Sequence, residues 1–462
     1  MSVKKNYFYN TAYQILAILI PLITTPYISR VLGAGGVGEY SYAYSVAGYF
    51  VMFILLGLNV YGNRTVATNR DNKELRTKTY WSIYFLQLFI ATIVFFLYFA
   101  YIVYKKFDTM AVILAIYVVS GAFDINWFFN GMEKFKLTVI RNSVVKILNV
   151  IAIFIFVKKP SDVYVYAVVM TLGIIVSNIA IWPYLKREVG FYLPSFKEIF
   201  AHLKPNLILF LPVVAISLYK IMDKIMLGVL TDTVQVGYYE SAEKIINLPI
   251  AFITSLGTVM IPRTSNLVAQ GKKKESRKYV GYSMVFAIAL SSSLAFGIMG
   301  VSKEFVPIFY GKGFEICVLL YMILMPATVF KAIANVVRTQ YLIPNKMDKH
   351  YVASVFFGAV VNIILNLILI PRSAAVGAAI ATFFAEASVC IFQCIDVYKL
   401  IPVGRYILKG VPFLILATIM FAVIFFISLP FSPLISLILK VIIGGCIYGV
   451  GTVIIIKATN AN

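Results

Sequence analysis

The stretch YFYNTAYQILAILIPLITTPYIS, residues 7–29, indicates the fold class, because it contains more than twenty residues, mostly apolar, and no charged side chain. A helix of about 20 residues crosses the roughly 30 Å hydrocarbon core of a bilayer. The stretch has no small-residue cleavage site and is too long for the core of a signal peptide. It therefore predicts a membrane-spanning helix that stays in the protein.

Similar apolar stretches recur along the whole chain, separated by short polar segments. The predicted spans are residues 7–29, 41–63, 81–104, 110–130, 139–157, 163–185, 204–230, 238–262, 281–302, 316–337, 351–370, 374–396, 410–429 and 434–456. No connecting segment is long enough to form a soluble domain. The sequence thus predicts an all-α polytopic membrane protein with 14 transmembrane helices.

Basic residues are distributed unevenly between alternate connecting segments. If Lys4 and Lys5 are cytoplasmic, 27 Lys and Arg residues fall on the inner side and only 8 on the outer side. By the positive-inside rule this predicts cytoplasmic termini in a multi-pass protein of the cell membrane.

Composition restricts the functional class in the same direction. The chain is 61% hydrophobic and 13% charged, with a mean hydropathy of +0.89, which excludes a soluble globular protein. The net charge of +22 is spread over the inner segments, where it orients helices and faces anionic lipid, so we predict no nucleic-acid partner. Four cysteines in apolar spans and two histidines predict neither a disulfide framework nor a metal site.

One motif imitates a nucleotide site. Residues 33–38, GAGGVG, fit the G-x-G-x-x-G fingerprint of dinucleotide-binding domains. That fingerprint follows a short strand and precedes an acidic residue about 20 positions later. Here a membrane-length helix precedes it and no acid follows at that distance, so the glycines predict a tight outer hairpin.

Weak internal similarity divides the chain. A shift of 199 positions sets Val37, Gly38 and Tyr40 on Val236, Gly237 and Tyr239. Six spans per copy make the copies parallel, which predicts two six-helix lobes related by a pseudo-twofold axis along the membrane normal. The expected divisions are residues 1–187, 188–400 and 401–462, the last holding spans 13 and 14. Repeated lobes around a central site favour transport over membrane-bound catalysis.

Charges within the spans are the candidates for function, since they are costly there and usually face a cavity or a partner. The predicted intramembrane charges are Lys146, Lys220, Lys224, Lys244, Lys331, Lys440, Asp124, Asp223, Glu240, Glu243 and Glu386.

The densest group lies in the seventh and eighth predicted spans. Lys220, Asp223 and Lys224 share one face of a continuous helix, and Glu240, Glu243 and Lys244 do the same in the next span. Two interpretations stay open: ion pairs that hold two antiparallel helices together, or lysines that bind an anionic head group beside an acid that carries protons. Arg30 favours the anion interpretation because guanidinium binds phosphate bidentately.

Several short motifs resemble those of a known family. They are Arg30-Val31-Leu32-Gly33, Val37-Gly38-Glu39-Tyr40, Tyr61-Gly62-Asn63-Arg64, Asp223-Lys224 with Leu227-Gly228, Val236-Gly237-Tyr238-Tyr239 and Gln340-Tyr341-Leu342-Ile343-Pro344. In order and spacing they are similar to the Wzx-type polysaccharide flippases of the multidrug/oligosaccharidyl-lipid/polysaccharide exporter superfamily.

The resemblance implies a function without enzymatic chemistry. It implies alternating access that moves oligosaccharide repeat units on undecaprenyl pyrophosphate from the inner to the outer leaflet, for O-antigen, capsule or a related polymer. It implies no cofactor beyond an H⁺ or Na⁺ gradient or the membrane potential, and as partners the lipid-linked oligosaccharide, membrane lipids, a polysaccharide polymerase and a chain-length regulator. Alternatives are a lipid II flippase, a drug or cation antiporter of the same superfamily, and an integral-membrane polymerase.

The resemblance also assigns expected roles to residues. Arg30, Lys220 and Lys224 match the cationic lumen of the family, and Asp223 matches its acidic position in the seventh span. Glu240, Glu243 and Lys244 are coupling or ion-pair candidates, Arg64 is a gate candidate, and secondary cavity candidates are Asp124, Lys146, Lys331 and Glu386. Span amides such as Asn126, Asn247 and Asn335 are expected to meet sugar hydroxyls.

Overall fold

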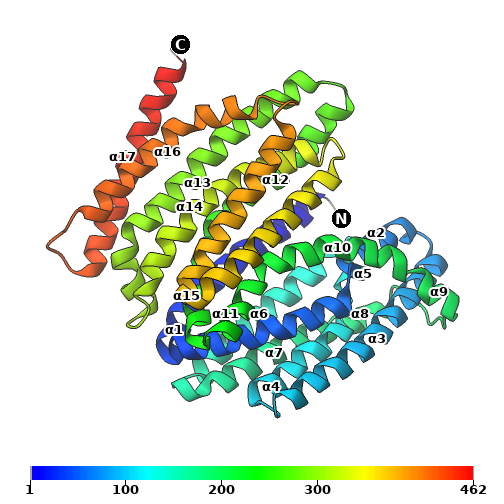
Figure 1. Cartoon of the computed structure of the whole chain (residues 1–462). Coiled ribbons are helices and arrows are strands. Elements are labelled where there is room, and N and C mark those ends of the chain that lie inside the picture. The colour runs from blue at the N-terminus through cyan, green and yellow to red at the C-terminus, as the bar shows by residue number, and fades with distance from the viewer. Residues whose placement is uncertain (1–2, 461–462) are drawn as a thin grey trace. The chain divides into compact units, whose positions relative to one another are not determined.

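The computed structural model describes residues 3–460, without the side chains of residues 3–15, 17–18, 219–220, 256, 258–259 and 459–460. It divides into two compact units, Met1–Ser217 (the N-unit) and Leu218–Asn462 (the C-unit). Within the described residues every element is helical (Figure 1). Twelve helical stretches there are long and apolar enough to cross a membrane.

The elements follow one another with short connections. The N-unit contains α1 (Val3–Leu55), α2 (Leu58–Asn69), α3 (Lys73–Tyr104), α4 (Thr109–Ser120), η1 (Gly121–Phe123), α5 (Asn126–Gly131), α6 (Phe135–Phe156), η2 (Pro160–Asp162), α7 (Val163–Ile179), α8 (Trp182–Leu185), α9 (Phe196–Ala201) and most of α10 (Leu203–Lys220). The C-unit continues with α11 (Met222–Leu230), α12 (Thr233–Ala269), α13 (Lys273–Tyr310), α14 (Ile316–Val337), the π-helical η3 (Arg338–Leu342), α15 (Asp348–Val397), α16 (Val403–Phe426) and α17 (Pro433–Asn460).

Two elements are far longer than a bilayer requires. Helix α1 has 53 residues and α15 has 50, and each contains one non-helical residue. In α1 this residue is Gly33, with φ 65°, a conformation that favours glycine. In α15 it is Ala374, where the chain folds back so sharply that a Cβ on Gly377 would lie 2.3 Å from the carbonyl oxygen of Leu369. Each long element is therefore a pair of helices, and the predicted hairpin at the glycine motif is a single-residue turn.

Other predicted spans are interrupted rather than continuous. The span expected at 41–63 breaks at Leu56 and Gly57, and the span expected at 110–130 is divided into α4, η1 and α5. Such a break leaves backbone carbonyls that need donors, because the bilayer core offers no water. The buried Gln87 side chain supplies them, donating to the carbonyls of Gly121 at 2.8 Å and Asp124 at 3.0 Å.

The division between the units falls at Ser217, inside the seventh predicted span and not at the expected residue 187. The reason is that α10 packs on the N-unit: Phe210 contacts Phe53, and the Tyr49 hydroxyl donates to the Ser217 carbonyl at 3.1 Å. Residues 401–462, expected as a separate pair of spans, belong to the C-unit, where α16 packs along α13 (Figure 1).

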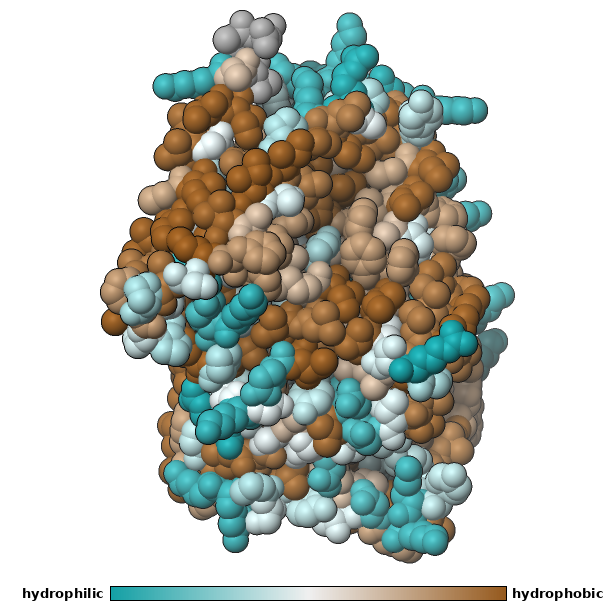
Figure 2. Space-filling view, turned by 60° about the vertical axis from the view of Figure 1, so that its left-hand side comes forward, coloured by the Kyte–Doolittle hydropathy of each residue, from teal (hydrophilic) through white to brown (hydrophobic). Residues whose placement is uncertain are grey.

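The surface of the protein matches its apolar composition. Large hydrophobic side chains cover much of the face in Figure 2, and those that are exposed include Phe96, Leu97, Phe426 and Ile454. Soluble monomers rarely expose large contiguous apolar patches, and in membrane proteins such surfaces face lipid. Together with the helix lengths they show a multi-pass membrane protein.

Candidate functional site

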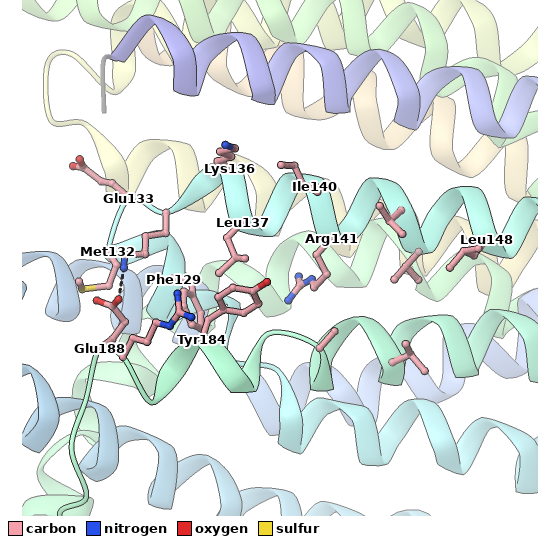
Figure 3. A pocket seen from close by; sticks show the side chains of 16 residues that line it. Phe129, Met132, Glu133, Lys136, Leu137, Ile140, Arg141, Leu148, Tyr184 and Glu188 are labelled. Carbon is pink, nitrogen blue, oxygen red and sulfur yellow. Dashed lines mark hydrogen bonds and ion pairs between the residues drawn. The ribbon is translucent and has the colours of Figure 1, made fainter.

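A long groove lies in the N-unit between α6 on one side and α7 with α8 on the other (Figure 3). Its volume is about 920 Å³, at the upper end of the range for ligand pockets. The side chains lining it, which define the N-unit groove, are Phe129, Met132, Glu133, Lys134, Lys136, Leu137, Ile140, Arg141, Val144, Val145, Leu148, Val176, Ala180, Tyr184, Arg187 and Glu188. From Lys136 to Leu148 the groove follows α6 for roughly 18 Å at 1.5 Å per residue.

The two ends of the N-unit groove differ in chemistry. The end near Leu148 and Val176 is apolar, whereas all four basic residues and both acidic residues lie toward the start of α6 and the end of α8. Glu133 pairs with Arg70 at 2.7 Å and Glu188 pairs with Lys134, so both acids already have cationic partners. Four basic against two acidic residues leave this end with a net charge of +2.

Arg141 lies inside the groove, opposite Tyr184 (Figure 3). Its Nη2 donates to Asn126 Oδ1 at 2.7 Å and to Asn142 Oδ1 at 2.8 Å. Asn126 is fixed in turn by Asp124, whose Oδ1 accepts from the Asn126 backbone amide at 2.9 Å and its side-chain amide at 2.7 Å. The interruption between α4 and α5 therefore orients a guanidinium group through an aspartate and an asparagine.

From the sequence, the basic residues of this groove are expected only to orient the spans in the membrane. Arg141 is expected among the 27 inner basic residues, at the cytoplasmic end of the span 139–157, but α6 starts at Phe135 and carries Arg141 a turn and a half into the helix. Asp124 was expected as a secondary cavity residue, and it lies behind Arg141. Arg187 and Tyr184 were not predicted, and the sequence held no signal that would have joined them to Arg141.

A second polar site lies inside the C-unit around Asp223 on α11, which is 1% exposed. Asp223 Oδ2 accepts from the hydroxyls of Tyr239 and Thr382, both at 2.7 Å, and Asp223 Oδ1 accepts from Asn366 Nδ2 at 2.5 Å. Asn366 Nδ2 also donates to Asn362 Oδ1 at 3.0 Å. We call these five residues the Asp223 network; all its donors are neutral.

This arrangement corrects one expectation about the seventh span. Lys220, Asp223 and Lys224 do not share a face of one continuous helix, because α10 ends at Lys220 and α11 begins at Met222, with Ile221 (φ −114°) between them. The side chain of Lys220 lies outside the described residues. Asp223 and Lys224 are neighbours in sequence, but the hydrogen bonds and ion pairs described for them go to different partners.

Lys224 belongs instead to a row of ion pairs. Its Nζ lies 2.9 Å from Glu240 Oε2 and 3.0 Å from Glu243 Oε2, and Lys244 Nζ lies 3.5 Å from Glu240 Oε1. Between α14 and α15, Lys331 pairs with Glu386 at 3.0 Å. We call these six residues, Lys224, Lys244, Lys331, Glu240, Glu243 and Glu386, the C-unit charge chain. Its three lysines and three glutamates balance.

The remaining predicted residues lie elsewhere. Arg30 is exposed, three residues before the turn at Gly33, and Arg64 is exposed on α2. Lys146 is half-buried on α6. Lys440 is buried on α17 and pairs with Glu304 of α13 at 2.7 Å, which is a contact between packed helices.

Comparison with known proteins places this structure in a family. The model for the family described as "Polysaccharide biosynthesis protein" matches residues 3–268. The chain is 25% identical over 383 residues to a proposed O-antigen transporter of Shigella dysenteriae, covering 81% of this chain and 95% of that protein. It is 23% identical over 396 residues to a proposed O-antigen transporter of Escherichia coli K12, covering 84% and 95% of the two chains.

The fold also matches a solved membrane transporter. A structure of the lipid II flippase MurJ in an inward closed conformation superposes with a TM-score of 0.79 at 16% identity, over 98% of this chain and 99% of that one. At this identity the match shows a shared fold. Because the family model covers more than half of the sequence, the chain belongs to the polysaccharide biosynthesis protein family, and its resemblance to the Wzx-type flippases is confirmed.

Proposed function

We propose that this protein flips undecaprenyl-pyrophosphate-linked oligosaccharides from the inner to the outer leaflet of the cytoplasmic membrane. The carried units would serve O-antigen, capsule or a related polymer. The observation that carries the proposal is the N-unit groove, where an apolar channel along α6 ends in a cluster with net charge +2. The family membership and the transporter relatives support transport rather than catalysis.

The groove has the chemistry that such a lipid requires. A phosphate needs charge-assisted donors, and guanidinium groups supply two parallel ones. Arg141, Lys136 and Arg187 lie at the basic end, where they neutralise the pyrophosphate. The side chains of Ile140, Val144 and Leu148 offer an apolar surface to the first isoprene units of the tail. A soluble cationic drug would meet the wrong sign of charge at this end.

The transport cycle needs a topology and an energy source. We propose 14 membrane crossings in two lobes, because α1 and α15 each contain two helices, with both termini in the cytoplasm. Arg30 and Lys220 would contact the anionic head group at other stages of alternating access, and Arg64 would act at the entry gate. Lys224, also expected at the head group, would instead hold α11 to α12 through Glu240 and Glu243. A polysaccharide polymerase and a chain-length regulator are the expected partners downstream.

The Asp223 network is the proposed coupling site for H⁺ or Na⁺. It offers carboxylate, amide and hydroxyl oxygens at one buried point, which suits a hard cation. Within the described residues, Asn366 Oδ1 is buried without a hydrogen-bond partner, so this amide oxygen is available as a further ligand for a bound ion. A proton on Asp223 would instead donate within the same network.

A lipid II flippase is the second candidate, favoured by the MurJ-like fold. Both candidate cargoes carry a lipid pyrophosphate, so the N-unit groove fits either one.

Reconstituted vesicles separate these candidates. Purified protein would receive a fluorescent undecaprenyl-pyrophosphate oligosaccharide, a fluorescent lipid II or a cationic dye, and a membrane-impermeant quencher would report the exposed fraction over time. We expect rapid flipping of the oligosaccharide lipid under an ion gradient. Flipping of lipid II alone would favour the second candidate, and movement of the dye alone would contradict both.

A further inference from the structure

A small polar pocket in the C-unit lies outside both the groove and the coupling site. It occupies about 160 Å³ among α12, α14 and α15. An apolar cavity of about 150 Å³ holds one benzene ring, so this volume suits a single six-membered ring. We call it the Arg338 pocket; its polar lining includes Asn247, Lys331, Asn335, Arg338, Glu386 and Gln393.

Arg338 is placed by an unusual turn. Helix α14 passes directly into the π-helix η3, which begins at Arg338. Turns of π-helix are rare in proteins, and those that occur are often found at functional sites. The Arg338 guanidinium donates through Nη2 to Asn335 Oδ1 at 2.8 Å and lies over the Tyr351 ring at 5.4 Å. Its Nε is buried without a hydrogen-bond acceptor among the described residues. The Nε–H group of Arg338 is therefore an unused hydrogen-bond donor.

Gln393 has an unused hydrogen-bond acceptor. Its side chain is 1% exposed, and its Nε2 donates to Ser354 Oγ at 2.9 Å. Its Oε1 is buried and accepts no hydrogen bond from any described residue. A buried amide oxygen left without a donor loses the hydrogen bond that it would make with water. An occupant that brings a donor to Gln393 and an acceptor to Arg338 would relieve both groups.

These two unmet groups restrict the chemistry of the occupant. A fully ionised phosphate offers only acceptors, and an apolar group offers neither donor nor acceptor. A sugar ring offers hydroxyls that do both, and Tyr351 presents an aromatic ring edged by a hydroxyl, a side chain suited to an occupant with apolar and polar parts. The Lys331–Glu386 pair adds one donor group and one acceptor group.

We propose that the Arg338 pocket binds one sugar residue of the carried glycan and that Arg338 and Gln393 select it through its hydroxyls. The identity of the ligand rests on the proposed function, whereas the pocket and its two unpartnered polar groups are described independently of that function. Asn247 and Thr254 of α12 are exposed at the pocket, so the sugar enters beside this helix.

Binding tests the pocket without transport. The full chain in lipid nanodiscs would be titrated with methyl glycosides of glucose, N-acetylglucosamine and glucuronate and with inorganic phosphate, using saturation-transfer NMR. At least one glycoside should bind saturably, and Arg338→Gln and Gln393→Leu should each weaken it on the order of tenfold. Arg263→Gln, which removes a similar arginine–tyrosine contact elsewhere in the C-unit, should leave binding unchanged.

The outcomes are distinct. Binding of no glycoside, equal binding by parent and variants, or equally strong saturation by phosphate alone would overturn the sugar site. In vesicles that flip lipid-linked oligosaccharide, both variants should raise the apparent KM and keep the maximal rate. Parent protein that binds the glycoside but flips no such lipid would refute the proposed function and leave the pocket intact.

Discussion

The N-unit groove and the C-unit charge chain hold similar numbers of charged side chains, yet they are built in opposite ways. The groove has four basic and two acidic residues around about 920 Å³ of space. In the C-unit charge chain, three lysines balance three glutamates, and their paired nitrogen and oxygen atoms lie 2.9 to 3.5 Å apart. Intramembrane charge alone therefore does not identify a binding site; excess charge beside open space does.

The physical basis is the cost of desolvation. A buried charge needs a partner of opposite sign. A lysine that is already paired with a carboxylate has little affinity left for a second anion. Lys224 lies against two glutamates, so its described geometry serves packing of α11 on α12. At the basic end of the groove, the number of cations exceeds the number of acids, and an anionic ligand can balance the difference. This contrast supports the proposal that the N-unit groove binds the cargo and that the Asp223 network couples transport to an ion.

The sharpest test of this division is Asp223→Asn. We expect transport to fall to background, because the neutral side chain can no longer attract a cation or release a proton, while binding of the lipid substrate in the N-unit groove persists. Vesicle flipping and substrate binding would be measured on the same preparation. Asp232→Asn changes a carboxylate that caps α12, a position that asparagine also fills well, and should keep transport. Normal flipping by Asp223→Asn would show that the Asp223 network does not couple transport to an ion.

Lys224→Ala should destabilise the protein more than any other single change in the C-unit charge chain. It leaves Glu240 and Glu243 buried without their shared cation, which costs about 3–5 kcal/mol. The melting temperature in detergent should fall clearly. Lys244→Ala, where the partner distance is 3.5 Å, should cost about 1 kcal/mol or less. If Lys224→Ala loses transport but keeps its melting temperature, Lys224 binds cargo and does not hold the helices together.

Arg141→Gln should affect transport and leave stability nearly unchanged. Loss of a charge-assisted contact to phosphate should lower kcat/KM for flipping roughly ten- to a hundredfold. Arg141→Lys should recover part of it, since lysine keeps the charge but not the planar fork. Arg277→Gln, an exposed arginine of α13, is the matched control. If both Arg variants flip normally, the groove is not the phosphate site.

Asp124→Asn should give the smallest effect. It keeps the side-chain shape but removes the charge that orients Asn126 and, through it, Arg141. We expect a loss of about 1 kcal/mol, or roughly fivefold in kcat/KM. Combining Asp124→Asn with Arg141→Gln should add nothing further, and a full additive loss in the double variant would show that Asp124 acts independently of Arg141.

Much of the fold could be predicted from the sequence because hydrophobic length is a local property. The spans, the hairpin at the glycine motif and the helix pair around residues 351–396 all follow from apolar runs and their breaks. The interruptions at Gly57, Gly121 and Ile221 were not predicted. The one at Gly121 depends on Gln87, a side chain 34 residues earlier in the sequence whose amide donates to the exposed carbonyl.

The candidate sites divide in the same way. The sequence by itself determined that this is a multi-pass helical membrane protein and which family it resembles, since these follow from composition and residue order. Only the tertiary structure decided that Asp223 and Lys224 have different hydrogen-bonding and ion-pair partners, and that Arg141 faces a groove while Lys224 faces two glutamates. The physical reason is that a charge acts through its neighbours within a few ångströms, and those neighbours come from helices far away in the sequence.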